Sequence, residues 1–558
     1  MRPQPPQEKP APSRPGGPLQ FLRFWRAQRQ PGAARVLSEG DAKAPSPALA
    51  LAAGAVGAGL WLPFGLAPFY WVAFLLFLIP FRRARDGRDA VKLGLAMGFA
   101  RYAVSAHFLL ALLRYSPLAI VFYLLAIAYI LPFAVLEAWG SFWLERRTGL
   151  PRAVGFGLIW VILEKVRTLS DLSFPADLLA HGMGASPDWL AITAWTGPFV
   201  VPLWMCLVAA GMLAAWTSWQ GGRRSRAALL AACSLAGWGL PRLAAPLLAG
   251  EHENPLPALR LSIVQPFATV DEKKDPRQWP RLRRRIWRMT RKAAEDADLI
   301  LWPESARPGP VIWRTSSPFA DEDLSQLSRE VGVPILYGAD LFAWDRTDGH
   351  RRLGKLYNGA ALATPRGTAR RWYGKQRLLP FAEGVPFADL IGWDPSRRKG
   401  GDGYLTLLGN FTPGPRPTLF QVGAARIGVL ICYEGMYPQL ARRYRNEGAN
   451  LLVVMTNDAW WGRSVFPAWH ATMAGSRARE LDVPVVRAAN SGVSSLADRL
   501  GHVQARTGVA ESTILRGTIR PSSTPPTFYA RHGDWLVGLD LLFVALALAF
   551  GIFRRRAV

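Results

Sequence analysis

Residues 427–438 read IGVLICYEGMYP, and this segment is the clearest sign of the architecture of the chain. Its strand-forming apolar residues end on Cys432, and the carboxylate of Glu434 follows two positions later, before a glycine. A cysteine that closes an apolar strand is most often a buried core residue. A strand that simply leads into a helix needs no carboxylate at the bend, which favours a nucleophile instead. A turn into a helix points amides toward the sulfur, which predicts a lowered thiol pKa.

The sequence on both sides of this segment alternates between strand-like and helix-like runs. We expect strands at 259–265, 297–304, 333–342, 356–365, 425–434, 450–459, 483–490 and 493–498, and helices near 277–296, 320–331, 436–447 and 467–481. This alternation predicts an α/β domain in which helices cover a buried sheet. Catalytic groups in such folds tend to lie where strands end.

Two further strand ends carry ionisable residues. Glu304 stands in WPES (302–305) after a short apolar run, and Lys375 precedes Glu383 in WYGKQRLLPFAEGVPF (372–387). Taken alone, the first is typical of a solvated turn glutamate and the second of a surface lysine. Taken with Cys432, they supply what acyl transfer requires, which is a base for the thiol proton and a cationic donor for the oxyanion.

Long apolar runs dominate the rest of the chain. Since about 20 apolar residues cross a bilayer core as a helix, we predict eight spans, near 47–63, 66–81, 91–113, 117–139, 151–167, 195–217, 226–246 and 536–553. Basic loops such as RRARDGR (82–88) follow every second span, whereas the short connections at 62–66 and 114–117 carry one charge between them. By the positive-inside rule, both termini are then cytoplasmic and residues from about 250 to 534 lie on the outer side.

Two aromatic segments outside the predicted spans, 170–189 and 460–469, are candidates for flexible loops that touch the lipid surface. Tryptophan and phenylalanine also serve as ordinary interfacial anchors, so both interpretations stay open. We expect His181, in the first segment, to be solvated rather than catalytic.

Composition narrows the function further. The chain has 558 residues and a net charge of +27, of which the outer domain carries about +12 from 40 Lys+Arg and 28 Asp+Glu. Nucleic acid is not expected outside the membrane, so we favour contact with anionic lipid headgroups.

The other two cysteines, Cys206 and Cys233, lie in apolar runs, and no pair has metal-ligand spacing. We therefore expect neither a disulfide framework nor a metal site. Residues 1–45, polar and without a hydrophobic period, are expected to form a disordered basic tail.

The trio Glu304, Lys375 and Cys432 resembles the triad of the nitrilase superfamily, whose members fold as an αββα sandwich. The chain from about 47 to 553 resembles a narrower family, the apolipoprotein N-acyltransferases of bacterial inner membranes, in which a periplasmic nitrilase-like domain precedes the last helix. The motifs WPES, GKQRLLPFAE, CYE, TNDAWWG and RAANSG occur in the order of that family. One departure is Ala382, where the family usually has a glycine. Alanine adopts positive φ less readily, which puts the placement of Glu383 in question.

The resemblance implies a role for each residue of the site. Glu304 is the general base, Lys375 stabilises the oxyanion, and Cys432 carries the acyl group as a thioester. Glu383 orients Lys375 or the base. The remaining site residues that the resemblance implies shape or line the pocket, and they are Tyr433, Glu434, Asn358, Asn457 and Asp458.

The resemblance also implies the reaction. An acyl chain passes from a phospholipid, usually phosphatidylethanolamine, to the cysteine, and then to the α-amine of the N-terminal diacylglyceryl-cysteine of a lipoprotein, with ping-pong kinetics and no cofactor. We expect four parts: the tail 1–45, a membrane domain 46–249, a periplasmic catalytic domain 250–534, and a final span with a basic cytoplasmic end, 535–558. Two other hypotheses stay open, a membrane-tethered amidase that passes the thioester to water and a non-catalytic scaffold that binds lipid or lipoprotein.

Overall fold

The computed structural model describes residues 44–249, 255–314, 319–344, 346–347, 350–351, 355–392 and 411–556. The disordered tail predicted at residues 1–45 lies almost wholly outside the described residues. Ser46–Val558 form one compact unit.

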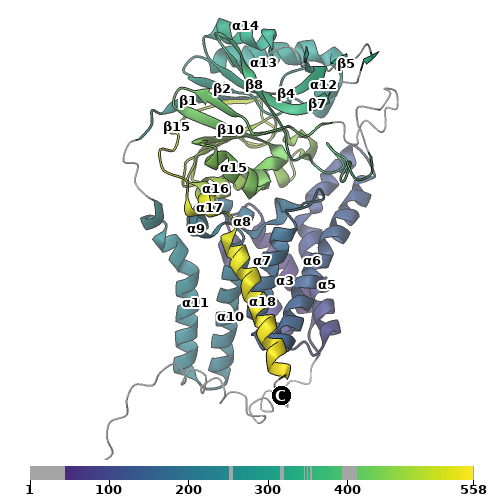
Figure 1. The fold of residues 1–558 in the computed structure, drawn as a ribbon, viewed down its shortest axis with the longest axis vertical. Coiled ribbons are helices and arrows are strands. Elements are labelled where there is room, and N and C mark those ends of the chain that lie inside the picture. The colour runs from purple at the N-terminus through teal and green to yellow at the C-terminus, as the bar shows by residue number, and fades with distance from the viewer. Residues whose placement is uncertain are drawn as a thin grey trace, which may run out of the picture. The chain divides into compact units, whose positions relative to one another are not determined.

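Helices make up the first part of this unit and its C-terminal end (Figure 1). The eight segments predicted as spans correspond to α3 (Pro47–Trp61), α4 (Trp71–Phe81), α5 (Gly87–Ser105), α6 (Ala119–Thr148), α7 (Arg152–Val166), α10 (Val200–Gln220), α11 (Arg224–Ala244) and α18 (Trp535–Arg556). Among the described residues, α6, α10, α11 and α18 have the length and hydropathy to cross a membrane. The pair of α5 and η2 (His107–Arg114), bent by 40°, is a fifth candidate. All eight segments are helical, but the predicted number of eight spans is not established.

Small residues let the helices of this part approach closely. A Cβ at Gly54 of α3 would lie 2.1 Å from the carbonyl oxygen of Met97 in α5, and one at Gly98 of α5 would lie 2.5 Å from the Cβ of Ala134 in α6. Apolar helices surrounded by lipid associate through such close backbone contacts. These glycines therefore permit the packing of α3, α5 and α6.

Two sheets with helices on their outer faces form the second part, as predicted (Figure 1). The first sheet has the order β15-β1-β2-β4-β7-β8, and the second has the order β14-β13-β12-β11-β10-β9. The helices α13 (Trp279–Ala293) and α14 (Glu322–Val331) pack on the first sheet, and α15 (Pro438–Asn446) and α16 (Phe466–Leu481) pack on the second. The layers are therefore those of an αββα sandwich, with one apolar core between the sheets.

Most strands lie where the sequence predicts them. In the first sheet they are β1 (Leu259–Gln265), β2 (Leu299–Leu301), β4 (Ile335–Trp344) and β7 (Lys355–Thr364); in the second they are β10 (Ala425–Ile431), β11 (Leu451–Thr456), β12 (Val485–Ala489) and β13 (Ser495–Ala497). The strands that were not predicted from the sequence include β3 (Val311–Arg314), β8 (Gly367–Gly374), β9 (Leu419–Val422), β14 (Val503–Arg506) and β15 (Thr513–Ile519). These strands lie at sheet edges or carry several polar residues, so their apolar signal is weak.

The parallel register of the central strands brings their carboxyl ends to one edge of each sheet. In the second sheet Ile431 pairs with Met455 and Thr456 pairs with Ala489, and in the first sheet Leu301 pairs with Ile263. The residues that follow these strands therefore meet at the same end of the sandwich.

The helical part and the sandwich share an apolar core, which includes Trp61, Phe108 and Trp160 together with Tyr437 and Trp469. The rings of Trp61 and Trp469 lie 4.7 Å apart between centroids. The two parts are thus joined by buried packing rather than by a flexible tether.

The segment that follows α7 reinforces this junction. Ser476 of α16 donates to the carbonyl of Ala180 at 2.9 Å, and a Cβ at Gly184 would lie 1.9 Å from the carbonyl oxygen of Thr472. His181 is completely buried here. The prediction of a solvated histidine was wrong, because the short helices α8 (Leu179–Gly182) and η4 (Met183–Ala185) pack against α16.

Candidate active site

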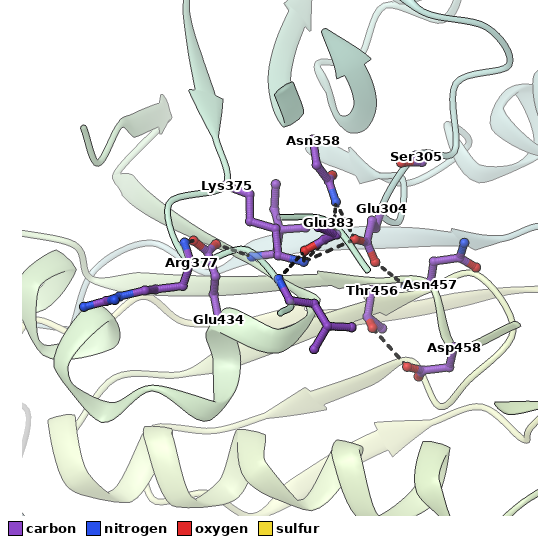
Figure 2. Close-up of polar contacts among 12 residues, drawn as sticks. Glu304, Ser305, Asn358, Lys375, Arg377, Glu383, Glu434, Thr456, Asn457 and Asp458 are labelled. Carbon is purple, nitrogen blue, oxygen red and sulfur yellow. Dashed lines mark hydrogen bonds and ion pairs between the residues drawn. The ribbon is translucent and has the colours of Figure 1, made fainter. Parts of the chain in front are cut away.

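Three predicted residues converge where β2, β8 and β10 end. Glu304 follows β2, Lys375 follows β8 directly, and Cys432 begins the short helix η10 (Cys432–Met436) directly after β10. The Nζ of Lys375 lies 3.7 Å from Oε1 of Glu304, and both side chains are buried (Figure 2). The structure therefore brings together, in one buried place, a carboxylate and a cation that stand 71 positions apart in the sequence.

Two of the turns at this edge have unusual backbone geometry. Cys432 has φ +51° and Ser305 has φ +44°, both in the left-handed region that non-glycine residues rarely adopt. Such strain persists only where the surrounding structure holds it, and it clusters at functional sites. The thiol of half-buried Cys432 is presented by a sharp strand-to-helix turn of this kind.

Glu304 is held by one side-chain amide and one backbone amide. Nδ2 of Asn358, in β7, donates to Oε1 at 2.7 Å, and the N–H of Asn457 donates to Oε2 at 2.7 Å (Figure 2). Burial raises the pKa of Glu304, although the charge of Lys375 and the bond from Asn358 oppose this. A carboxylate with raised proton affinity and a fixed orientation is suited to act as a general base.

Lys375 is paired with two carboxylates. Its Nζ lies 2.7 Å from Oε2 of Glu383, which also accepts from the N–H of Leu379 at 2.8 Å. Burial acts to lower the pKa of Lys375, but the charges of Glu383 and Glu304 outweigh it and raise the pKa far above its usual value. The ammonium therefore stays charged, as the stabilisation of an oxyanion requires.

The alanine at position 382 does not displace Glu383. The residue with positive φ in this turn is Phe381, at +63°, and Ala382 is not among the residues with positive φ. The backbone at position 382 therefore does not need a glycine, and Glu383 reaches Lys375.

The thiol of Cys432 is not acidified in this structure. Burial, followed by the charge of Glu304, raises its pKa well above the usual value, and Lys375 lowers it only in part. The predicted lowering of the thiol pKa was therefore wrong, because burial and a nearby carboxylate outweigh the amides of the turn. The thiol keeps its proton until a base removes it, and Glu304 is the neighbouring carboxylate.

Glu434 lies in the protein interior beside the site and is not exposed to solvent. It is completely buried and accepts from the N–H of Arg377 at 3.1 Å (Figure 2). It also accepts from the N–H groups of Ile431 at 2.8 Å and Gln376 at 2.6 Å and from the hydroxyl of Tyr373 at 2.8 Å. It thereby ties the end of β10, which precedes the cysteine, to the residues that follow Lys375.

Tyr433 connects the site to the helical part. Its hydroxyl donates to the carbonyl of Ser173, in the segment after α7, and the hydroxyl of Tyr437 lies 2.5 Å from the Oγ of the same serine. The position next to Cys432 is thus anchored on a residue 260 positions away.

The side chains of Asn457 and Asp458 point away from Glu304. Oδ1 of Asn457 accepts from Nδ2 of Asn490 at 2.8 Å. Oδ2 of Asp458 accepts from Nη2 of Arg487 at 2.8 Å. Burial acts to raise the pKa of Asp458, but the charge of Arg487 and the bond to His470 outweigh it and lower the pKa to about 2.

Asp458 forms a buried network with Thr456, His470 and Arg487, and no role was predicted from the sequence for these three partners. Thr456 donates to Oδ1 of Asp458 at 3.0 Å, and the same oxygen lies 3.2 Å from Nδ1 of His470. Thr456 also bonds to the thiol of Cys432, whose pKa it lowers. Three members of the network, Thr456, Asp458 and Arg487, lie in the motifs TNDAWWG and RAANSG, whereas nothing in the sequence marked His470. Within the described residues, no group of three or more His, Cys, Asp or Glu side chains could hold a metal ion.

Comparison with known proteins finds similar sequences over most of the chain. Residues 53–211 match the family model described as the apolipoprotein N-acyltransferase N-terminal domain, and residues 260–527 match the one described as carbon-nitrogen hydrolase. The chain is 30% identical to an apolipoprotein N-acyltransferase of Azotobacter vinelandii over 532 residues, which is 92% of this chain and 96% of the relative. It is 29% identical to one of Geobacter metallireducens over 507 residues, 88% of this chain and 92% of the relative.

Two solved structures are similar to about half of the chain. A CN-hydrolase superfamily protein of Xanthomonas campestris is 20% identical, with a TM-score of 0.34, and the match covers 48% of this chain and 92% of that protein's chain. An amidase of Nesterenkonia is 17% identical, with a TM-score of 0.32, and covers 52% of this chain and 99% of its own.

Proposed function

This chain belongs to the apolipoprotein N-acyltransferase family, and we propose that it moves an acyl chain from a membrane phospholipid, through a thioester on Cys432, to the α-amine of the N-terminal diacylglyceryl-cysteine of lipoproteins. The observation that carries this proposal is the convergence of Glu304, Lys375 and Cys432 at one buried strand edge. The helical part that shares a core with the sandwich supports a lipid donor, because a diacyl lipid does not leave the bilayer readily.

In the first half-reaction Glu304 takes the proton of the Cys432 thiol as the sulfur attacks the ester carbonyl of the phospholipid. The negative charge of the tetrahedral intermediate develops on the former carbonyl oxygen, and the ammonium of Lys375 stabilises it. The C–O bond then breaks, and the leaving alkoxide takes the proton from Glu304. The products are a lysophospholipid and an acyl thioester on the cysteine.

In the second half-reaction the lipoprotein amine attacks the thioester carbonyl. Glu304 accepts a proton from the amine nitrogen, Lys375 again stabilises the oxyanion, and the C–S bond breaks. The cysteine thiolate recovers the proton from Glu304, which restores the starting state. Because the first product leaves before the second substrate reacts, the kinetics are ping-pong.

The remaining site residues are assigned supporting roles in this proposal. Glu383 and Asn358 hold Lys375 and Glu304 in position, and Glu434 braces the strand ends beneath them. Asn457 holds Glu304 through its backbone N–H, and Tyr433 and Asp458 support the turn that carries the cysteine and the strand end beside it.

The location and the lipid donor are also part of the proposal. We assign the sandwich, residues 250–534, to the periplasmic side of the bacterial inner membrane, with residues 46–249 and 535–558 in or beside the bilayer and both termini in the cytoplasm. The alternation of basic loops supports this orientation. Phosphatidylethanolamine is the proposed acyl donor.

Intact mass spectrometry of the purified full-length protein, after incubation with a defined phospholipid, tests the proposal. We expect a hydroxylamine-labile acyl adduct that maps to Cys432, is absent from Cys432→Ala, and disappears when a diacylated lipopeptide is added. An adduct that decays equally fast without the lipopeptide would identify a hydrolase. Folded protein that never forms an adduct would refute the covalent mechanism.

A further inference from the structure

Three exposed basic residues, Arg114, Lys274 and Arg463, lie on or follow two touching aromatic rings beside the active site, and we call them the cationic patch. The Nζ of Lys274 lies 4.7 Å from the centroid of the Trp460 ring, and Arg463 follows Trp460 by three positions. Tyr115 packs edge-on against Trp460, with 5.3 Å between the ring centroids.

Arg114 reaches the same loop from the helical part of the protein. Its guanidinium lies 5.6 Å from the centroid of Tyr115 and packs directly on Gly462, where a Cβ would lie 2.2 Å from Nη1. Its Nε donates to the carbonyl of Ala111 at 2.9 Å, which holds the side chain in this direction. The patch is therefore built from both parts of the chain.

The patch adjoins the catalytic carboxylate. Trp460 belongs to η11 (Asp458–Trp461), which directly follows Asn457, the residue whose N–H holds Glu304. Lys274 ends α12 (Val270–Lys274), and the Nζ of the preceding residue, Lys273, donates to the carbonyl of Glu304 at 3.1 Å. One short helix thus directs one lysine behind Glu304 and the next lysine onto Trp460.

The patch is also expected at the depth of the lipid headgroups. Arg114 is the last residue of η2, which continues the bent span that begins with α5, and α6 begins at Ala119. A residue in the short turn between two candidate spans is expected at the end of the hydrocarbon region. A lipid that offers its ester to Cys432 would have its phosphate close to this level.

The charges of the patch are not neutralised within the described part of the protein. No described carboxylate lies within salt-bridge distance of Arg114, Lys274 or Arg463, whereas Glu272, on the same helix as Lys274, is paired with Arg285 at 2.9 Å. Cations left without an acidic partner beside a catalytic site are suited to an anionic ligand.

We propose that the cationic patch binds the phosphodiester of the donor phospholipid and thereby holds its ester at Cys432. This inference rests on the proposed function and deepens it. The diacylglyceryl-cysteine acceptor carries no phosphate, so the patch serves the first half-reaction and not the second. Phosphate is thus the group by which the protein distinguishes the donor lipid from the acceptor lipoprotein.

The test compares Arg114→Gln, Lys274→Gln and the double variant in the full-length protein, in detergent micelles with a fixed mole fraction of donor. Single-turnover mass spectrometry measures the rate of adduct formation on Cys432, first with phosphatidylethanolamine and then with p-nitrophenyl palmitate, which has no phosphate. A third measurement follows the loss of the adduct on addition of a diacylated lipopeptide.

We expect each single variant to slow acylation by the phospholipid about threefold to fivefold, and the double variant about tenfold or more, since each basic residue near a lipid surface contributes modestly. Acylation by p-nitrophenyl palmitate and transfer to the lipopeptide should stay at the wild-type rate. Arg531→Gln is the matched control, because Arg531 is exposed in α17 (Phe528–His532), just before α18, and lies outside the patch.

Three results would overturn the proposal. Unchanged acylation by the phospholipid would show that the patch does not bind the donor. An equal loss with p-nitrophenyl palmitate would show a structural role, and an equal loss in Arg531→Gln would show general attraction to lipid. Failure of the wild-type protein to form an adduct with either donor would instead refute the proposed function itself.

Discussion

The carboxylate of Glu434 is a buried brace, by which we mean that it connects the end of β10 to the residues after Lys375. Its substitution by glutamine removes one of the two acceptor oxygens. The carboxylate accepts from the N–H groups of Gln376, Arg377 and Ile431 and from the hydroxyl of Tyr373. A glutamine can place its oxygen toward Gln376 and Arg377, but its NH₂ group then faces the N–H of Ile431. A donor therefore meets a donor inside the protein, and the N–H of Ile431 loses its side-chain acceptor.

The size of the effect follows from these bonds. An unpaired buried N–H costs about 1–3 kcal/mol, and a neutral acceptor weakens each remaining bond by about 1 kcal/mol relative to a charged one. Burial raises the pKa of Glu434, which means that the charge is itself unfavourable to bury, so its removal offsets part of the loss. We expect the variant to be less stable by about 2–3 kcal/mol, which lowers Tm by about 5 °C.

The effect on catalysis should be about as large as the effect on folding. Glu434 connects the residue before Cys432 to the two residues after Lys375, so its loss moves the nucleophile relative to the cation. Misplacement of reacting groups by about 1 Å lowers a rate about 100-fold. Single-turnover acylation of the cysteine, measured beside thermal unfolding, separates the two effects.

Glu447→Gln is the control for this experiment. Glu447 forms a surface ion pair with Arg443 at 3.0 Å and has a side chain 39% exposed. Its substitution should change the free energy of unfolding by less than about 1 kcal/mol and leave acylation unchanged. If Glu434→Gln acylates at the wild-type rate and unfolds at the wild-type temperature, the reasoning about the brace is incorrect.

Three further predictions follow from the same site. The rate of acylation should fall as pH is lowered through a midpoint above 4.5, because Glu304 must be deprotonated to act as a base and burial raises its pKa; an unchanged rate down to pH 4 in a stopped-flow profile would contradict this. Asp458→Asn should destabilise the protein by about 3–5 kcal/mol in denaturant unfolding, because it leaves buried Arg487 without its carboxylate, and the double variant Asp458→Asn/Arg487→Met should recover part of the loss. Tyr433→Phe should lower stability by about 1 kcal/mol, because the buried carbonyl of Ser173 loses a donor while the ring keeps its packing; equal Tm values would argue against that bond.

Much of the fold and the identities of the main site residues could be predicted from the sequence. The apolar runs before Glu304 and Cys432 are local features, and each is long enough to mark a buried strand whose last residue opens a turn. The eight helical segments were predicted for the same reason, since a long apolar run is visible without knowledge of its partners. Lys375 was placed at a strand end as a candidate cationic donor, although the strand that precedes it, β8, was not itself predicted.

The properties of these residues depended on neighbours that are distant in the chain. The thiol pKa of Cys432 is raised because burial and Glu304 outweigh the turn amides, whereas the local sequence predicted the opposite. His181 is buried because α16, almost 300 positions later, packs over it.

The sequence by itself therefore determined where most of the strands and the apolar helices lie, because those follow from side chains within a few positions of one another. Only the tertiary structure decided which ionisable groups are buried, which are paired, and which face solvent. Glu434 holds strand ends together, and Asp458 pairs with Arg487, through contacts between residues of different strands. Arg114 lies on the ring of Tyr115 and Lys274 on the adjoining ring of Trp460, although the two basic residues come from different parts of the protein. Electrostatics and burial depend on distance in space, and distance in space between such residues is set by packing alone.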